Sequence, residues 1–276
     1  MTDDAVEMHA ETEHAEPPFE IVMVGGGNMG AALASGMIDA GVAVAGLAVV
    51  EVVDARRDEL AHLLPGVRVV AEVPPCRAAV IAVKPASVAA AIEHAVAGGA
   101  RRILSIAAGV TLESLERAAG ADVAVVRCMP NTPALVGEGA SAIVGGSTAT
   151  DDDLDWAESI LASVGIVERL PEPLLDVFTG VAGSGPAYVF LVAEALTDAA
   201  VVEGLPRATA ERVVTQLLLG SSTLLARDGN AAQLRANVTS PGGTTAAGLA
   251  RLERHAVRAA FGDAVTAATA RSRELG

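Results

Sequence analysis

The stretch FEIVMVGGGNMGAALASGMIDAG, Phe19–Gly41, decides the fold of the first half of this chain. Its apolar residues 19–24 predict a buried strand, and the small residues that end the stretch predict a helix. Gly25, Gly27 and Gly30 stand between them with the spacing G-x-G-x-x-G. The first glycine permits a tight turn, the second lets a pyrophosphate approach the backbone, and the third lets the helix pack on the strand. The stretch therefore predicts a dinucleotide-binding unit.

Strands and helices alternate outward from this stretch to about residue 172. Apolar runs at 46–52 and 78–83 predict two more strands, and 101–146 reads as strand, turn and helix followed by strand, proline-bracketed loop and strand. Thr111 is the predicted cap of one helix, and Thr150 or Asp151 that of the next. Such alternation is typical of the α/β class, so we expect a doubly wound parallel sheet of the dinucleotide-binding type over 19–172.

The remaining residues, 173–276, predict an all-α domain. One helix is expected from Ser184 or Gly185 to a stop at Gly204, a second over 206–229, and one or two more from Thr244 onward. These helices consist largely of Ala, Val and Leu. A domain with so much apolar surface is expected to pack against a second copy, which makes the chain a homodimer or a larger homo-oligomer.

Composition excludes several classes of protein. The chain has 276 residues, 34 acidic and 19 basic, with a formal charge of −15, which argues against nucleic acid or an anionic membrane as partner. No run approaches the roughly 18 uninterrupted apolar residues of a membrane span. The acid excess indicates salt adaptation, with a GC-rich genome as the alternative explanation.

Residues 1–18 are read as a disordered acidic tail without a targeting signal, which favours the cytoplasm. Neither cysteine, Cys76 or Cys128, has metal-ligand spacing, so no metal site is expected and both are interpreted as buried small hydrophobes.

Charged residues near the predicted cofactor crevice bear on the choice of cofactor. Glu51 ends the second strand 26 residues after Gly25, where an acid hydrogen-bonds ribose hydroxyls and repels a 2′-phosphate. It favours NADH, whereas Arg56 and Arg57 lie within reach of a 2′-phosphate and leave NADPH open. Lys84, the one lysine of the chain, follows a buried strand and is predicted to point into the crevice. The alternative for Lys84 is an ordinary strand-end lysine.

A second candidate site lies in NVTSPGGTTAAGLARLE, 237–253, which has no charged residue before Arg251. Ser240 is the predicted helix cap and Pro241 belongs to the first turn. Gly242 and Gly243 let a ligand approach backbone N–H groups, and the two threonines that follow add hydroxyls. A donor-rich helix start without side-chain charge predicts a seat for a carboxylate. The alternative is a capped turn without a ligand.

Six motifs together resemble pyrroline-5-carboxylate reductase: GGGNMG, VKP, SIAAGVTLESL, VRCMPNTPALVGEG, GSGPAYVF and the stretch 237–253. The resemblance covers the chain from about Phe19 to its end. It implies NADPH or NADH as cofactor, hydride transfer to a cyclic imine with L-proline as product, interlocked dimers, and sites built from two subunits. Many relatives have a small hydroxyl residue where Glu51 stands, so the usual NADPH preference does not follow here.

The resemblance also implies roles for individual residues. The pyrophosphate is held by Gly25, Gly27, Asn28, Met29 and Gly30. The adenosine and ribose are bordered by Val83, Lys84 and Pro85, and the nicotinamide side by Ala107, Asn131 and Thr132. The substrate carboxylate and imine nitrogen are taken by Ser240, Gly242, Gly243, Thr244 and Thr245.

The chemistry of an imine agrees with this reading. A protonated imine is already an electrophile, so the protein must mainly hold it against the cofactor and seat its carboxylate. Thr245 is the candidate that hydrogen-bonds the nitrogen and relays a proton from water. A 3-hydroxyacid dehydrogenase would resemble this layout but place a catalytic lysine on the helical domain, where this chain has none. A reductase of another cyclic imine acid and a non-catalytic dinucleotide-binding regulatory module remain as alternatives.

Overall fold

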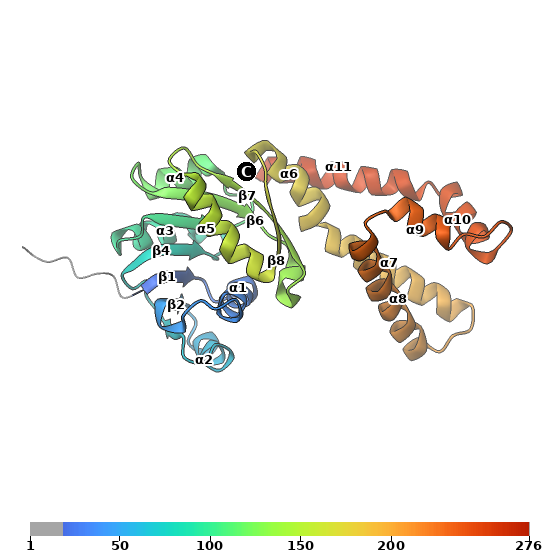
Figure 1. Cartoon of the computed structure of the whole chain (residues 1–276), viewed down its shortest axis with the longest axis horizontal. Helices are drawn as coiled ribbons and strands as arrows, with labels where there is room; N and C mark the ends of the chain where they lie inside the picture. The colour runs from blue at the N-terminus through green and yellow to red at the C-terminus, as the bar shows by residue number, and fades with distance from the viewer. Residues whose placement is uncertain (1–18, 276) are drawn as a thin grey trace, which may run out of the picture.

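The computed structural model describes residues 19–275. The tail predicted for 1–18 lies outside the described residues. A sheet with helices on its faces forms one end of the molecule, and a long helical arm extends from it (Figure 1). The strands are β1 Phe19–Val24, β2 Leu47–Val50, β3 Arg68–Val70, β4 Cys76–Ile81, β5 Arg102–Ser105, β6 Ala124–Met129, β7 Gly139–Gly145 and β8 Gly165–Arg169.

The eight described strands form one sheet in the order β3-β2-β1-β4-β5-β6-β7-β8. The pairs from β3 to β6 are parallel, which confirms the predicted doubly wound sheet. β7 pairs antiparallel with β6, and β8 pairs parallel with β7, so the last two strands run opposite to the rest. β3 and β8 were not predicted, because neither contains a fully buried residue and their apolar runs are therefore weak.

Helices cover both faces of the sheet and bury two apolar clusters against it. Both predicted caps in this part form: the Thr111 side chain accepts from the Ser114 N–H, and Thr150 makes a capping box with Asp153. Cys76 and Cys128 are free and buried, as expected. The helices here are α1 Asn28–Asp39, α2 Asp54–Leu63, α3 Val88–Ala97, α4 Leu112–Ala119 and α5 Asp151–Leu161.

The helical arm differs from its prediction in two places. Ser184 stands at the N-cap position of α7, as predicted, but its side chain makes no capping hydrogen bond, and a π-helical turn, Thr179–Gly183, directly precedes it. Asn230 caps a further helix, α9, that was not among the predicted helices; its Oδ1 accepts from the Gln233 N–H at 3.0 Å. Gly204, with φ +103°, ends α7 as predicted. The arm contains α6 Leu175–Phe178, α7 Gly185–Val202, α8 Arg207–Asp228, α9 Ala231–Asn237, α10 Thr244–Arg254 and α11 Val257–Leu275.

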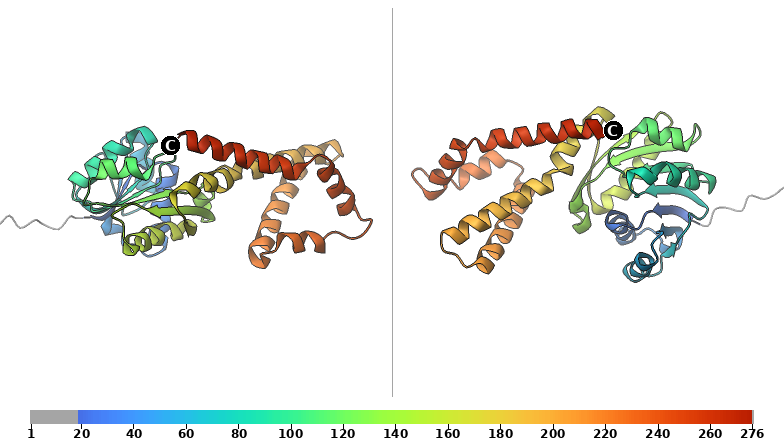
Figure 2. Two further views of the ribbon diagram at one scale, coloured as in Figure 1. Left: turned by 90° about the horizontal axis from the view of Figure 1, so that it is seen from above. Right: turned by 180° about the vertical axis from the view of Figure 1, so that it is seen from behind.

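The chain returns to the sheet at its end. α7 leads away from the sheet, and α8 packs against α7. α11 then runs from the far end of the arm back to the sheet (Figures 1 and 2). There Ser272 Oγ donates to Asp176 Oδ1 at 2.6 Å. Leu275 lies against the turn at Gly109. The two ends of the arm are therefore both fixed to the sheet region, and its middle is not.

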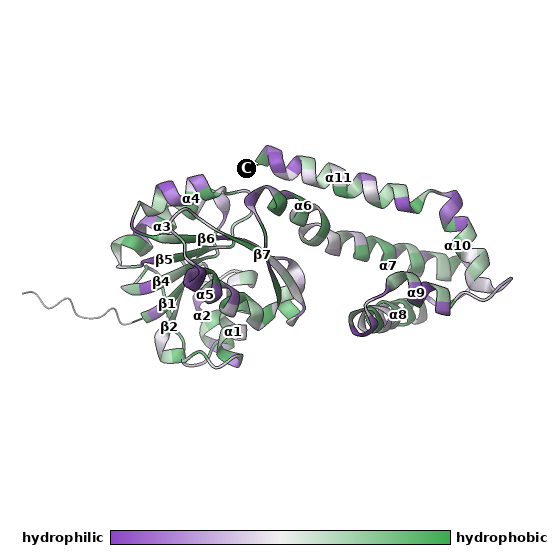
Figure 3. Ribbon diagram, turned by 45° about the horizontal axis from the view of Figure 1, so that its top comes forward, coloured by the Kyte–Doolittle hydropathy of each residue, from purple (hydrophilic) through white to green (hydrophobic). Residues whose placement is uncertain are grey.

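Apolar surface on the arm is extensive. α7 is green along most of its length in Figure 3, although much of it faces outward. Phe190 and Leu191 are 65% and 63% exposed. Within the described residues, the helical stretch Glu172–Val202 is long and apolar enough to cross a membrane by length and composition alone, and only 6% of its most apolar window is buried. The helical arm thus exposes apolar side chains that no other described part of the same subunit covers.

Candidate active site

The glycine loop between β1 and α1 is built by contacts within the chain. Gly25 has φ +111°, and its N–H donates to the Val50 carbonyl at 2.9 Å. A Cβ at Gly25 would lie 2.5 Å from the Ala82 carbonyl oxygen, and a Cβ at Gly30 would collide with the Gly25 carbonyl. These two glycines are required by the close packing of β1, β4 and α1.

Gly27 differs from its neighbours because nothing in the protein needs it to be glycine. Its φ of −63° suits any residue, and a Cβ there would meet no atom within 4 Å. It precedes the first residue of α1, a helix start without a side-chain cap. Asn28 and Met29 form the first turn. Open space over uncapped N–H groups is what a pyrophosphate needs, so the loop fits a dinucleotide.

A cavity of about 630 Å³ lies beside this loop at the carboxyl ends of β1, β2 and β4. Val24, Val50, Val52 and Val83 line it together with the small residues of α3. Its apolar walls and its position next to the loop suit an adenosine group. Of the three residues expected to border adenosine, Val83 lines this cavity, whereas Lys84 is exposed and lines neither this cavity nor the next.

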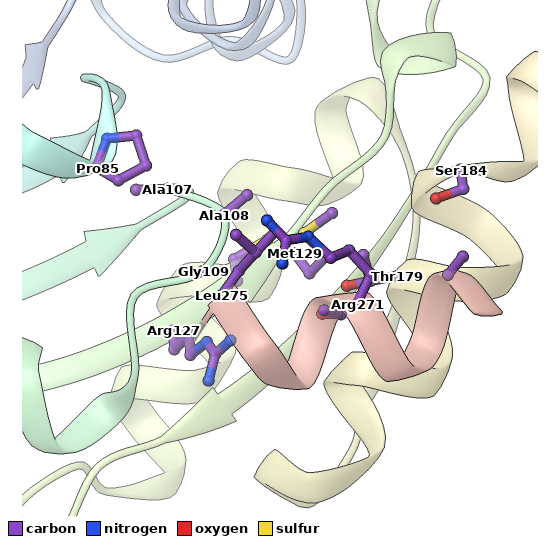
Figure 4. Close-up of a pocket in the computed structure, with 13 residues that line it drawn as sticks. Pro85, Ala107, Ala108, Gly109, Arg127, Met129, Thr179, Ser184, Arg271 and Leu275 are labelled. Atoms are coloured by element: carbon purple, nitrogen blue, oxygen red, sulfur yellow. The ribbon is translucent and has the colours of Figure 1, made fainter. Parts of the chain in front are cut away.

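A second cavity, of about 520 Å³, lies at the carboxyl ends of β5 and β6. Pro85 and Ala107 border it, so Pro85 lies on the side predicted for nicotinamide rather than beside adenosine. Figure 4 shows Arg271 reaching from α11 toward Ala108 and Met129. The cavity is therefore enclosed partly by the sheet region and partly by the last helix.

Residues from the end of α11 are the part of this cavity that the sequence reading missed. Ala268, Arg271, Ser272 and Leu275 line it. They lie more than 150 residues after Ala107 in the chain, and no motif marks them. Only the return of α11 to the sheet brings them there.

Arg127 and Cys128 line this cavity, and neither is free to act as a catalytic base or nucleophile. Arg127 Nη1 lies 2.5 Å from Glu172 Oε1, which also accepts from the Leu112 N–H at 2.8 Å, so this arginine is held in an ion pair. Burial raises the pKa of the Cys128 thiol far above its ordinary value, with a smaller opposing effect from Ser141. Burial also raises the pKa of Cys76, to about 11. Neither thiol ionises near neutral pH, so neither is a nucleophile.

Asn131 and Thr132 follow β6. The Asn131 side chain donates to the Ala182 carbonyl at 3.1 Å and accepts from the Ala140 N–H at 2.8 Å. It joins the β6–β7 connection to the π-helical turn, and both ends of its amide are occupied. Thr132 is exposed at the start of a short 3₁₀ turn, Thr132–Val136. Asn131 therefore has a structural role, and neither Asn131 nor Thr132 is among the residues that line the second cavity.

The Ser240–Thr245 turn lies at the far end of the arm from both cavities (Figure 1). The predicted cap was wrong: α10 begins at Thr244, and Gly243 is its N-cap. Ser240 instead accepts from the Gly243 N–H at 3.1 Å, and Gly242 has φ +71°. Proline at the second position and glycine with positive φ at the third are typical of a type II β-turn, which explains why the helix starts later.

This turn keeps the features expected of an anion seat. Most of its residues are exposed, and a Cβ at Gly242 would meet nothing within 4 Å. α10 starts without a side-chain cap, so its first N–H groups are uncovered. Within one subunit, however, the turn lies at the far end of the arm from both cavities.

Comparisons with known proteins agree with each other. The family described as pyrroline-5-carboxylate reductase dimerisation matches residues 172–275. A pyrroline-5-carboxylate reductase of Synechocystis is 47% identical over 199 residues, covering 71% of this chain and 74% of that protein. The enzyme of Methanosarcina acetivorans is 39% identical over 266 residues, covering 93% and 98%.

Solved structures give the same answer over nearly the whole chain. A pyrroline-5-carboxylate reductase from Coxiella burnetii matches with a TM-score of 0.86 and 33% identity, covering 94% of this chain and 99% of that one. The Plasmodium falciparum enzyme, with NADP bound, matches with a TM-score of 0.79 and 30% identity, covering 95% and 100%.

Proposed function

Because this chain belongs to the pyrroline-5-carboxylate reductase family, we propose that its active site joins the cofactor cavities of one subunit to the Ser240–Thr245 turn of another. The chain is an NAD(P)H-dependent oxidoreductase that reduces 1-pyrroline-5-carboxylate to L-proline, the last step of proline biosynthesis. One observation carries the proposal: within one folded subunit the turn and the cavities are at opposite ends of the molecule, and the arm between them exposes apolar helices.

The proposed cofactor site runs along the carboxyl ends of the strands. Gly25, Gly27, Asn28, Met29 and Gly30 hold the pyrophosphate. Glu51 and Val83 border the adenosine side, with Lys84 at the crevice edge. Pro85 and Ala107 border the nicotinamide, while Asn131 and Thr132 shape that edge. The bound nicotinamide supplies the hydride; the chain's own residues orient its ring and exclude water.

The proposed substrate site is the turn with the start of α10. Backbone N–H groups around Gly242 and Gly243 seat the carboxylate, with Ser240 and Thr244 beside them, because a helix start favours an anion. The Thr245 hydroxyl hydrogen-bonds the imine nitrogen and relays to it a proton that the hydroxyl takes back from water. We infer that no strong acid is needed, since the protonated imine accepts hydride once it is held against the cofactor.

Subunit complementation tests this arrangement. Gly27→Val fills the pyrophosphate space, and Gly243→Val places a side chain against Ser240 inside the proposed substrate turn. Each variant alone should be inactive. If every site takes its two halves from different subunits, a heterodimer of the two keeps one intact site, so random co-assembly should restore about a quarter of wild-type activity.

The matched control is a chain that carries both substitutions, coexpressed with wild type under separate affinity tags. Purified heterodimers of that pair have no intact site if the halves come from different subunits, and one intact site if both come from the same chain. Activity in the control and none in the complementation pair would overturn the proposal.

We propose the division into 19–172 and 173–276 as two domains, because the last described strand ends at Arg169 and the described elements after it are all helical. The apolar faces of α7 and α8 are proposed to meet a second copy rather than a membrane, because a dimerisation family covers this region. A cytoplasmic location fits an enzyme that uses soluble metabolites.

Salt adaptation is proposed from the formal charge of −15. Unfolding followed by circular dichroism should shift to higher temperature between dilute buffer and molar KCl. A flat profile would instead favour genome composition as the cause of the acid excess.

A further inference from the structure

Glu51 lies between the glycine loop and the adenosine cavity. It directly follows β2, and its neighbours Val50 and Val52 both line the cavity. Its Oε1 accepts from the Val53 N–H at 3.0 Å, and its Oε2 would be 3.3 Å from a Cβ at Gly26. The carboxylate is thus fixed beside the loop that holds the pyrophosphate, at the place where the adenosine ribose connects loop and cavity.

The two arginines that follow are committed to the backbone of the same region. Arg56 Nε donates to the Gly26 carbonyl at 2.9 Å, and its Nη1 pairs with Glu59 at 2.8 Å. Arg57 Nη1 donates to the Glu51 carbonyl at 2.8 Å, and its Nη2 pairs with Asp54 at 2.6 Å. Both side chains are only about a quarter exposed, at 27% and 25%. They tie α2 to the glycine loop and to the end of β2.

The other cations of this region are placed elsewhere. Lys84 follows β4, which lies on the opposite side of β1 from β2. Two strand spacings separate β2 from β4, about 10 Å. Arg68 begins β3 and lies over the Phe19 ring, at the opposite end of the parallel strands. A phosphate on the ribose 2′-oxygen would therefore meet the Glu51 carboxylate with no uncommitted guanidinium beside it among the described residues.

We propose that Glu51 is the specificity-determining residue that makes this enzyme prefer NADH to NADPH. Arg56 and Arg57 are positioning residues that fix the glycine loop and Glu51, and they do not read a 2′-phosphate. This inference rests on the proposed cofactor site. The ribose hydroxyls donate to the carboxylate, whereas a phosphate has only acceptor oxygens and negative charge to offer it.

Direct binding tests the inference without turnover. Calorimetric titration of the full-length enzyme with NADH and with NADPH, at one salt concentration, should give tighter binding for NADH. In Glu51→Gln the ratio of the two dissociation constants should fall by roughly tenfold to hundredfold, the scale of one hydrogen bond to a charged group. Glu168→Gln, an exposed site on β8, removes the same charge far from the loop and should leave the ratio unchanged.

The variants Arg56→Gln and Arg57→Gln test whether these arginines position the glycine loop or bind a 2′-phosphate directly. Loss of a positioning residue weakens both dinucleotides by the same factor, whereas loss of a phosphate reader weakens NADPH alone. Wild-type binding that favours NADPH, an unchanged ratio in Glu51→Gln, or a selective loss of NADPH binding in either arginine variant would each overturn the inference. Failure of the wild type to bind either dinucleotide would instead contradict the proposed cofactor site itself.

Discussion

Two apolar stretches of this chain lie in opposite surroundings. In β1, Val22 and Met23 are completely buried between the helices on either face of the sheet. In α7, Val189, Phe190 and Leu191 are 50%, 65% and 63% exposed. Parallel strands are covered on both faces by the helices that connect them, so the sheet region completes its own core. The arm has no such cover.

The difference shows which part of the protein depends on a partner. α7 and α8 pack on each other, yet Ala210 and Val214 are the buried apolar residues of that pair in the described structure. A helix that is apolar around most of its circumference needs a neighbour on more than one side. The sheet region is expected to fold within one chain, and the arm to be ordered only in an oligomer.

Phe190→Asp should have the largest effect. A charge placed in the apolar interface costs about 3–5 kcal/mol per copy because it has no partner there. We expect monomers in sedimentation experiments, loss of imine reduction, and retained dinucleotide binding.

The matched control for Phe190→Asp is Leu63→Asp, which places the same charge at a residue 56% exposed on α2. It should leave assembly unchanged. An assembled, active Phe190→Asp enzyme would refute the expected dependence of the arm on a partner.

Gly27→Val should break function in the sheet region without breaking its fold. A Cβ at Gly27 meets no protein atom, so the cost falls on the ligand, and dinucleotide affinity should drop by about a hundredfold or more. Thermal unfolding should be nearly unchanged. Gly30→Val is the contrast, because its side chain collides with the Gly25 carbonyl and should lower stability as well.

Asn131→Ala tests the connection between the two regions. It leaves the Ala140 N–H and the Ala182 carbonyl without their partner, which should cost about 2 kcal/mol in denaturant unfolding. Hydrogen exchange should increase in the π-helical turn, Thr179–Gly183. If exchange increases only in the sheet region, the side chain does not hold the arm.

Asp153→Asn should have the smallest effect and concern the sheet region alone. Burial by itself would raise the pKa of Asp153, but hydrogen bonds from Thr150 and the ion pair with Arg102, at 2.6 Å, outweigh burial and lower it. A lowered pKa stabilises the fold above the unfolded value of about 4, and this contribution is lost as the pH falls through the folded pKa. The variant should lose about 1 kcal/mol at pH 7, and the difference from wild type should shrink in acid. A difference independent of pH would show that the charge does not matter.

Local patterns in the sequence were enough for much of the fold. The strand, glycine turn and helix at 19–41 formed as predicted, because each step depends on neighbouring residues. The caps at Thr111 and Thr150 also formed, since a cap bonds N–H groups within the next turn. Two capping predictions were less successful, because the capping preference of a single serine does not determine how the surrounding backbone turns. Ser184 is at the N-cap position of α7 but makes no side-chain capping bond, and Ser240 was predicted as a cap, whereas Pro241 and Gly242 form a β-turn before α10 begins.

The sequence by itself determined the fold class and the two motifs proposed to bind cofactor and substrate, the glycine loop and the Ser240–Thr245 turn, because each motif is contiguous in the chain. Only the tertiary structure decided where those motifs lie. It placed the turn far from both cavities, brought the end of α11 to Ala107, and used Arg56 and Arg57 to fix the glycine loop. Such contacts depend on the direction in which long helices leave the sheet, and packing between residues distant in sequence sets that direction.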